Sequence, residues 1–114
     1  MKIFFEKTTD ELYPNELPFE DVYCIRNERE AFVGLIYLSE LPDGNIYVDW
    51  IEILVVQRGR GYLREIFKTL AEMFPSKEIH FECEEKLKKK YLHIGCEELG
   101  ISDLTGNYKM VYKR

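Results

Sequence analysis

A strand-like run gives way to a helical pattern within one stretch, Val55-Val56-Gln57-Arg58-Gly59-Arg60-Gly61-Tyr62-Leu63. Residues 46–56 form a long run of β-type residues. From Tyr62 onward, apolar residues recur at helical spacing and charged residues lie on the opposite face. The apolar positions are Leu63, Ile66, Phe67, Leu70, Met73 and Phe74. The stretch therefore predicts a buried strand that turns through a loop of glycine and arginine into a helix over residues 62–74.

This strand-to-helix junction has the chemistry of an anion-binding site. Glycine lets the backbone approach a phosphate closely. The first N–H groups of a helix lack internal acceptors, and the helix dipole favours negative charge there. Arg58 and Arg60 would add charge-assisted hydrogen bonds to a pyrophosphate. The junction thus predicts a ligand that carries phosphate groups.

The remaining patterns predict further strands and a second helix. We expect strands at residues 2–6, 22–26, 31–39, 78–82 and 108–112, and a helix over 84–92 that ends before Gly95. Turns at residues 27–30 and 41–45 would make three consecutive strands antiparallel. Residues 8–21 have room only for a short helical turn or an irregular connection, because they contain Pro14 and Pro18. The expected fold class is α+β, with a mostly antiparallel mixed sheet and flanking helices.

Length and composition limit the classes of protein to be considered. The 114 residues fit one domain, residues 1–114, with 46% hydrophobic residues and no apolar run long enough to span a membrane. The net charge of -5 opposes binding to nucleic acid. The first residues lack the features of a signal peptide, so a cytoplasmic location is expected. Cys24, Cys83 and Cys96 are too widely spaced for a zinc or redox motif, so we expect reduced thiols and no metal site.

Three segments carry a resemblance to a known family. Arg58, Gly61 and Leu63 occupy the places of a signature that reads Arg or Gln, two residues, Gly, one residue, and Gly or Ala, with Leu63 in place of the small residue. Residues 91–96 are similar to a Tyr, three residues, Gly, Phe segment, with Cys96 in place of Phe. Residues 31–34 are similar to strand three of the same family. From Cys24 to its end, the sequence resembles the GNAT superfamily of N-acetyltransferases.

The resemblance implies a cofactor and a set of site residues. Acetyl-coenzyme A (acetyl-CoA) would pair its pantetheine arm with the edge of strand four, and Tyr91 would be the general acid for the departing CoA thiolate. The backbone N–H of Val55 would meet the oxyanion. The positions expected to bind the cofactor are Val55, Val56, Arg58, Gly59, Arg60, Gly61, Tyr62 and Leu63. Residues 86–90, rich in lysine, form a solvated helix face or meet the 3′-phosphate of the cofactor.

Transfer of an acetyl group to an amine needs a base that deprotonates the attacking amine, and the strand before the loop contains two candidates for it. Glu52 is the first choice and Asp49 the second, and a β-bulge would change which of them faces the cleft. The neighbouring aromatic residues Tyr47 and Trp50 are interpreted as part of the scaffold, because aromatic residues on strands usually belong to the core.

The expected function is transfer of an acetyl group from acetyl-CoA to a primary amine by direct attack in a ternary complex. The part before strand two is short for the family, so we expect an open cleft for a protein or peptide amine, or a site completed by a homodimer. Two alternatives stay open. Leu63 and Cys96 motivate a GNAT-like domain that binds CoA without catalysis. The net negative charge and the acidic residues within 10–21 motivate an acidic module that binds another protein.

Overall fold

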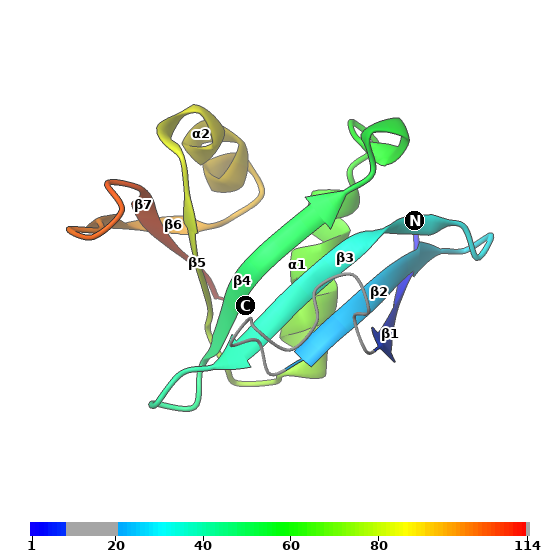
Figure 1. The fold of residues 1–114 in the computed structure, drawn as a ribbon, viewed down its shortest axis with the longest axis horizontal. Helices are drawn as coiled ribbons and strands as arrows, with labels where there is room; N and C mark the ends of the chain where they lie inside the picture. The colour runs from blue at the N-terminus through cyan, green and yellow to red at the C-terminus, as the bar shows by residue number, and fades with distance from the viewer. Residues whose placement is uncertain (9–20, 114) are drawn as a thin grey trace.

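The computed structural model describes residues 1–8 and 21–113, and within them the chain forms one seven-stranded sheet with two α-helices (Figure 1). The strands lie in the order β1-β2-β3-β4-β5-β7-β6. Most of the connection expected at 8–21 lies outside the described residues. The elements are β1 (Ile3–Thr8), β2 (Asp21–Asn27), β3 (Phe32–Glu40), β4 (Ile46–Ile53), the 3₁₀ turn η1 (Val55–Gln57), α1 (Tyr62–Met73), β5 (Ile79–Cys83), α2 (Glu85–His93), β6 (Glu97–Ile101) and β7 (Tyr108–Tyr112).

The pairing of the strands confirms the expected α+β class. Neighbouring strands are antiparallel except for β4 and β5, which are parallel. A parallel pair needs a crossover connection, and α1 provides it between β4 and β5. Figure 1 shows α1 running behind β3 and β4. The helix therefore covers one face of the sheet and brings its own first turn to the end of β4.

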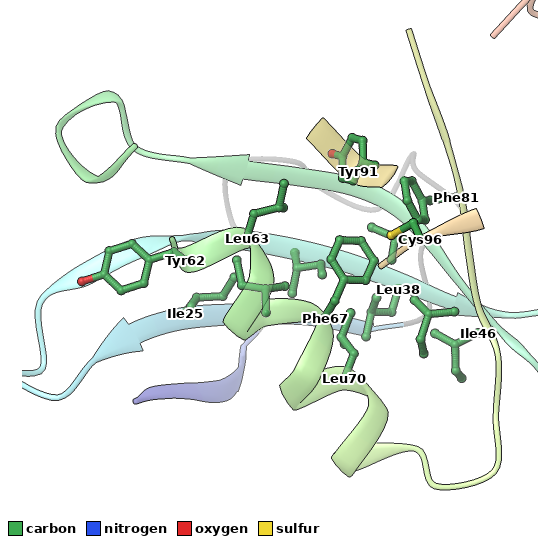
Figure 2. Packing of buried hydrophobic residues seen from close by; sticks show 14 of the residues in the cluster. Ile25, Leu38, Ile46, Tyr62, Leu63, Phe67, Leu70, Phe81, Tyr91 and Cys96 are labelled. Atoms are coloured by element: carbon green, nitrogen blue, oxygen red, sulfur yellow. The ribbon is translucent and has the colours of Figure 1, made fainter. Parts of the chain in front are cut away.

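The core forms where α1 packs against this sheet (Figure 2). Ile66, Phe67 and Leu70 are fully or almost fully buried, as their helical spacing predicts. The ring centroid of Phe67 lies 5.1 Å from that of Phe81 on β5. Each such buried side chain contributes about 1.5–3 kcal/mol relative to its exposed form. No helix in the described part of the chain is long and apolar enough to cross a membrane.

Two strand predictions need correction. The strand expected to reach Val56 ends at Ile53, because the N–H groups of Gln57 and Arg58 donate to the carbonyls of Leu54 and Val55 and close a 3₁₀ turn. These local hydrogen bonds prevail over the β-propensity of two valines. Strand β6 was not expected, because it is an exposed edge strand with no alternation of buried residues and with a register shift beside Gly100.

Gly34 stands where β3 and β4 approach too closely for a side chain. A Cβ at this position would lie 2.0 Å from the carbonyl oxygen of Glu52, so the backbones of both strands would have to shift. We expect Gly34→Ala to lower the free energy of unfolding by about 2–3 kcal/mol, as measured by urea denaturation. Lys109→Ala, at an exposed position of β7, is the control and should change it by less than about 0.5 kcal/mol. Equal stability of the two variants would contradict the close approach.

Candidate active site

Strands β4 and β5 pair only at their beginnings and then separate. Their register contains Ile46 opposite Ile79 and Tyr47 opposite His80. Beyond these pairs β4 continues along β3 while β5 continues along β7, and Figure 1 shows the two strands diverging. A cleft of about 330 Å³ opens between them. It is lined from β4 by Val48, Asp49, Trp50 and Ile51, from β5 by Phe81, Glu82 and Cys83, and otherwise by Phe67, Glu84, Leu87, Tyr91 and Asn107.

A β-bulge decides which carboxylate of β4 enters the cleft. Val48 lies opposite Leu38 and Trp50 lies opposite Tyr37, so Asp49 is an extra residue in β4. Asp49 lines the cleft, whereas Glu52 is exposed and outside its lining. Of the two carboxylates expected to act as base, the structure brings only the second choice to the cleft.

The edge of β4 presents backbone groups to the cleft. The N–H of Leu54 donates to the carbonyl of Val33, which shows that the backbone N–H groups of Leu54 and of every second residue before it, as far as the bulge, point toward β3. Backbone direction alternates along a strand, which places the amides of Ile51 and Ile53 on the cleft side. Such an edge can pair with an extended ligand. Val55, expected to be the oxyanion donor, lies beyond the strand in η1, so the strand-edge donors are Ile51 and Ile53.

Tyr91 enters the cleft from α2. Its side chain is 8% exposed and packs against Phe81 at a centroid distance of 4.7 Å and edge-on against Phe67 at 6.0 Å. Figure 2 shows its hydroxyl oxygen at the end of the ring away from Phe81. Burial, with smaller effects of Cys83 and Cys96, raises the pKa of Tyr91 to about 12. Within the described chain no hydrogen bond engages the hydroxyl, so Tyr91 offers a neutral O–H donor.

The cleft has an acidic rim. Asp49, Glu82 and Glu84 all line it. The Oε1 of Glu82 accepts a hydrogen bond of 2.6 Å from Oγ1 of Thr105, which holds the carboxylate in place. Burial, followed by the charges of Glu82 and Asp49, raises the pKa of Tyr47 to about 12. The carboxylates thus create a negative potential that favours a cationic ligand.

Trp50 was interpreted from the sequence as a scaffold residue, and the three cysteines were expected to be reduced thiols. Trp50 is 52% exposed and lines the cleft, which its place in a β-type run did not reveal. Cys83 and Cys96 are buried free thiols, and Cys24 is a half-buried one. Desolvation raises the pKa of all three thiols, which keeps them protonated. No group of three His, Cys, Asp or Glu side chains suited to a metal ion occurs in residues 1–8 and 21–113.

The glycine and arginine loop leaves the first turn of α1 accessible to a ligand. Gly59 and Gly61 have φ angles of 77° and 84°, a left-handed backbone that favours glycine. Gly61 is the N-cap of α1, and no side chain caps this end of the helix. A Cβ on Gly59 would meet no atom within 4 Å. Open space over a glycine backbone and an uncapped helix start suit a phosphate group.

The side chains around this loop have different roles. Val55 and Val56 are 74% and 71% exposed beside the β4 edge. Arg58 donates from Nε to the carbonyl of Ile53 at 2.9 Å, so its guanidinium folds over the end of that edge. Arg60 is exposed.

Tyr62 and Leu63 would meet a ligand at this end of α1 through their backbone N–H groups, because their side chains are buried. Tyr62 is buried, and its hydroxyl accepts a hydrogen bond from Nδ2 of Asn27 at 3.1 Å. Leu63 belongs to the core, as Figure 2 shows. A phosphate at the start of the helix would therefore meet their N–H groups and not their side chains.

Comparison with known proteins identifies the architecture. No protein-family model matches the sequence, and no curated protein matches it. Among solved structures, a variant of the spermidine N-acetyltransferase SpeG from Vibrio cholerae is similar, with 18% identity, a TM-score of 0.66, and coverage of 84% of this chain and 65% of that chain. An acetyltransferase of the GNAT family from Listeria monocytogenes has 17% identity and a TM-score of 0.64, covering 82% of this chain and 64% of that chain.

The spermidine N-acetyltransferase from Vibrio cholerae in complex with CoA and spermine is also similar, with 18% identity and a TM-score of 0.64, covering 82% of this chain and 64% of that chain. The chain thus spans just under two thirds of the length of these three solved structures. At this level of identity the likeness concerns the fold. The splayed parallel pair of the sheet and the helix that begins at a glycine loop agree with these solved structures. This chain therefore has the GNAT fold.

Proposed function

We propose that this protein transfers the acetyl group of acetyl-CoA to a primary amine by direct attack in a ternary complex. The observation that carries the proposal is the cleft between β4 and β5. It combines a strand edge, a carboxylate at a β-bulge and a buried phenol, and β4 runs from it to the glycine loop at the start of α1. A thioester with a pantetheine arm and a pyrophosphate matches these features in chemistry and in their order along β4.

Particular residues are suited to holding acetyl-CoA. Arg58, Gly59 and Gly61 would hold the pyrophosphate together with the first N–H groups of α1. The amides of Ile51 and Ile53 would pair with the pantetheine arm or polarise the thioester carbonyl. When bound, acetyl-CoA supplies an activated acyl carbon. The chain's contribution is to position that carbon against the amine.

The acetyl transfer forms a C–N bond and breaks a C–S bond. The amine must give up a proton, and Asp49, which lines the cleft, would take it directly or through a water molecule. Tyr91 lines the same cleft and would face the CoA sulfur, on which negative charge would develop. Full proton transfer from a phenol with a pKa of about 12 to an ordinary thiolate, whose thiol has a pKa of about 8.5, is uphill by about 5 kcal/mol. Tyr91 therefore acts by donating a hydrogen bond to the sulfur as its charge develops.

The acidic rim supports a cationic acceptor. Asp49, Glu82 and Glu84 attract amines with more than one positive charge. The similar Vibrio cholerae enzyme was solved with CoA and spermine, so polyamines belong in the first acceptor panel with lysine and peptide amines. The test is release of CoA thiol from acetyl-CoA. Release that requires both the protein and an amine supports the proposal, while binding of acetyl-CoA without release by any amine supports the alternative of a CoA-binding domain without catalysis.

The variant Asp49→Asn tests which of the two carboxylates of β4, Asp49 or Glu52, acts as the base. We expect it to lower kcat/KM about 100-fold, because the amide cannot take the proton of the attacking amine. Glu52→Gln, on the same strand but outside the cleft, is the matched control and should retain the activity of the unmodified protein. Steady-state thiol release measures both variants. The opposite order of effects would show that Glu52 is the base and that the bulge does not direct the chemistry.

A further inference from the structure

A second cavity lies beside the start of α1. Its volume is about 510 Å³, and it is formed by the segment before β1, the turn between β2 and β3, and the glycine loop. Three cations line it, one from each of these segments: Lys2, Arg29 and Arg60. The remaining lining comes from Met1, Asn27, Glu28 and Tyr62.

The charge of this cavity is unusual for the protein, which carries a net charge of -5. Among the described residues, none of its three cations forms an ion pair. Many of the other cations do, namely Lys7, Arg26, Lys68, Lys86, Lys88 and Lys113. The single carboxylate of the lining, Glu28, accepts a hydrogen bond of 2.9 Å from the backbone N–H of Lys2. The cavity therefore has an excess of positive charge without an internal partner.

Hydrogen bonds hold the cavity wall in place against the helix. Oδ1 of Asn27 accepts from the N–H groups of Arg29 at 2.9 Å and Ala31 at 3.0 Å, which fixes the turn between β2 and β3. Nδ2 of the same side chain donates to the hydroxyl of Tyr62, the first residue of α1. The backbone of Arg29 is thereby held relative to the helix start, and Arg60 belongs to both the loop and the cavity.

We propose that this cavity binds the 3′-phosphate of CoA. The inference rests on the proposed function, because it requires the pyrophosphate of CoA to lie at the start of α1. The 3′-phosphate is a monoester that carries up to two negative charges and lies one ribose away from that pyrophosphate. Such a group is best met by several cations at once, with arginine favoured for its paired donors. Lys2, Arg29 and Arg60 meet this requirement beside the loop.

The lysine-rich face of α2 is the rival location. There, Lys86 pairs with Glu84 at 3.3 Å and Lys88 pairs with Glu98 and lies over the ring of Tyr108. Lys89 and Lys90 form no ion pair within the described residues, and both are exposed, so truncating Lys89 leaves the helix packing intact. Lys89→Ala is therefore the matched control for Arg29→Ala.

The test compares CoA with dephospho-CoA, which lacks only the 3′-phosphate, by isothermal titration calorimetry. The unmodified protein should bind CoA about tenfold more tightly than dephospho-CoA, which corresponds to about one charge-assisted contact. Arg29→Ala should weaken CoA binding to the level of dephospho-CoA and leave dephospho-CoA binding unchanged. Lys89→Ala should retain the preference. Circular dichroism of each variant confirms that it is folded.

Three results would overturn the inference while the proposed function stands. These are equal binding of CoA and dephospho-CoA by the unmodified protein, a preference that persists in a Lys2→Ala, Arg29→Ala double variant, and a preference that Lys89→Ala abolishes. Absence of binding by both ligands is a different result, because it would overturn the proposed function itself and this inference with it.

Discussion

Tyr91→Phe is expected to lower kcat by about 10²–10³-fold and to leave the affinity for acetyl-CoA unchanged. Phenylalanine keeps the ring that packs against Phe81 and Phe67 and removes only the hydroxyl. The hydroxyl would contribute little to binding of the substrates in the ground state. It would stabilise the negative charge that develops on the sulfur in the transition state. An interaction made only there affects kcat and not binding. Steady-state thiol release and calorimetric titration together measure the two effects.

The control for this variant is Tyr112→Phe, which removes a phenol hydroxyl from another core aromatic, one whose ring lies 5.4 Å from that of Phe67 and outside the cleft. It should retain kcat. The pH profile gives a further check, because a pKa raised to about 12 keeps Tyr91 protonated at every pH below about 11. An alkaline loss of activity near pH 10, present in the unmodified protein and absent in Tyr91→Phe, would contradict the burial of this phenol.

Gly61→Glu is expected to weaken acetyl-CoA binding by at least about 100-fold, or about 2.7 kcal/mol. The φ angle of 84° at this N-cap favours glycine. A new carboxylate there would occupy the proposed position of the pyrophosphate and repel its negative charge. A carboxylate near a helix N-terminus is itself favourable, so the variant should remain folded. Calorimetric titration measures the affinity, and circular dichroism measures the fold.

Gly44→Glu is the matched control, because it adds the same charge at a glycine with a φ angle of 89° in the turn between β3 and β4. Its affinity for acetyl-CoA should equal that of the unmodified protein. If both variants lost binding, net charge and not the helix start would explain the effect. If neither lost binding, the pyrophosphate would have to lie elsewhere.

The sequence predicted the features that depend on local patterns. Helix α1 follows from the spacing of Leu63, Ile66, Phe67 and Leu70, and it begins where the glycines predict. The antiparallel order of β2, β3 and β4 follows from two short turns between β-type runs. In each case the signal lies within a few residues of the structure that it specifies.

The features that the sequence did not reveal depend on neighbours distant in the chain. The bulge at Asp49 is a mismatch of register between β3 and β4, so the choice between Asp49 and Glu52 needs both strands. The end of β4 depends on the turn after Leu54. Lys2, Arg29 and Arg60 lie far apart in the sequence and meet only through the fold. Spacing along the chain contains no signal for any of these.

The most direct test of the proposed acetyl-CoA site is a calorimetric titration of the unmodified protein with acetyl-CoA. We expect one site per chain and a dissociation constant of about micromolar order, which corresponds to about -8 kcal/mol. No heat of binding at millimolar acetyl-CoA, with the protein shown to be folded, would contradict the assignment of the splayed cleft and the helix start to this ligand.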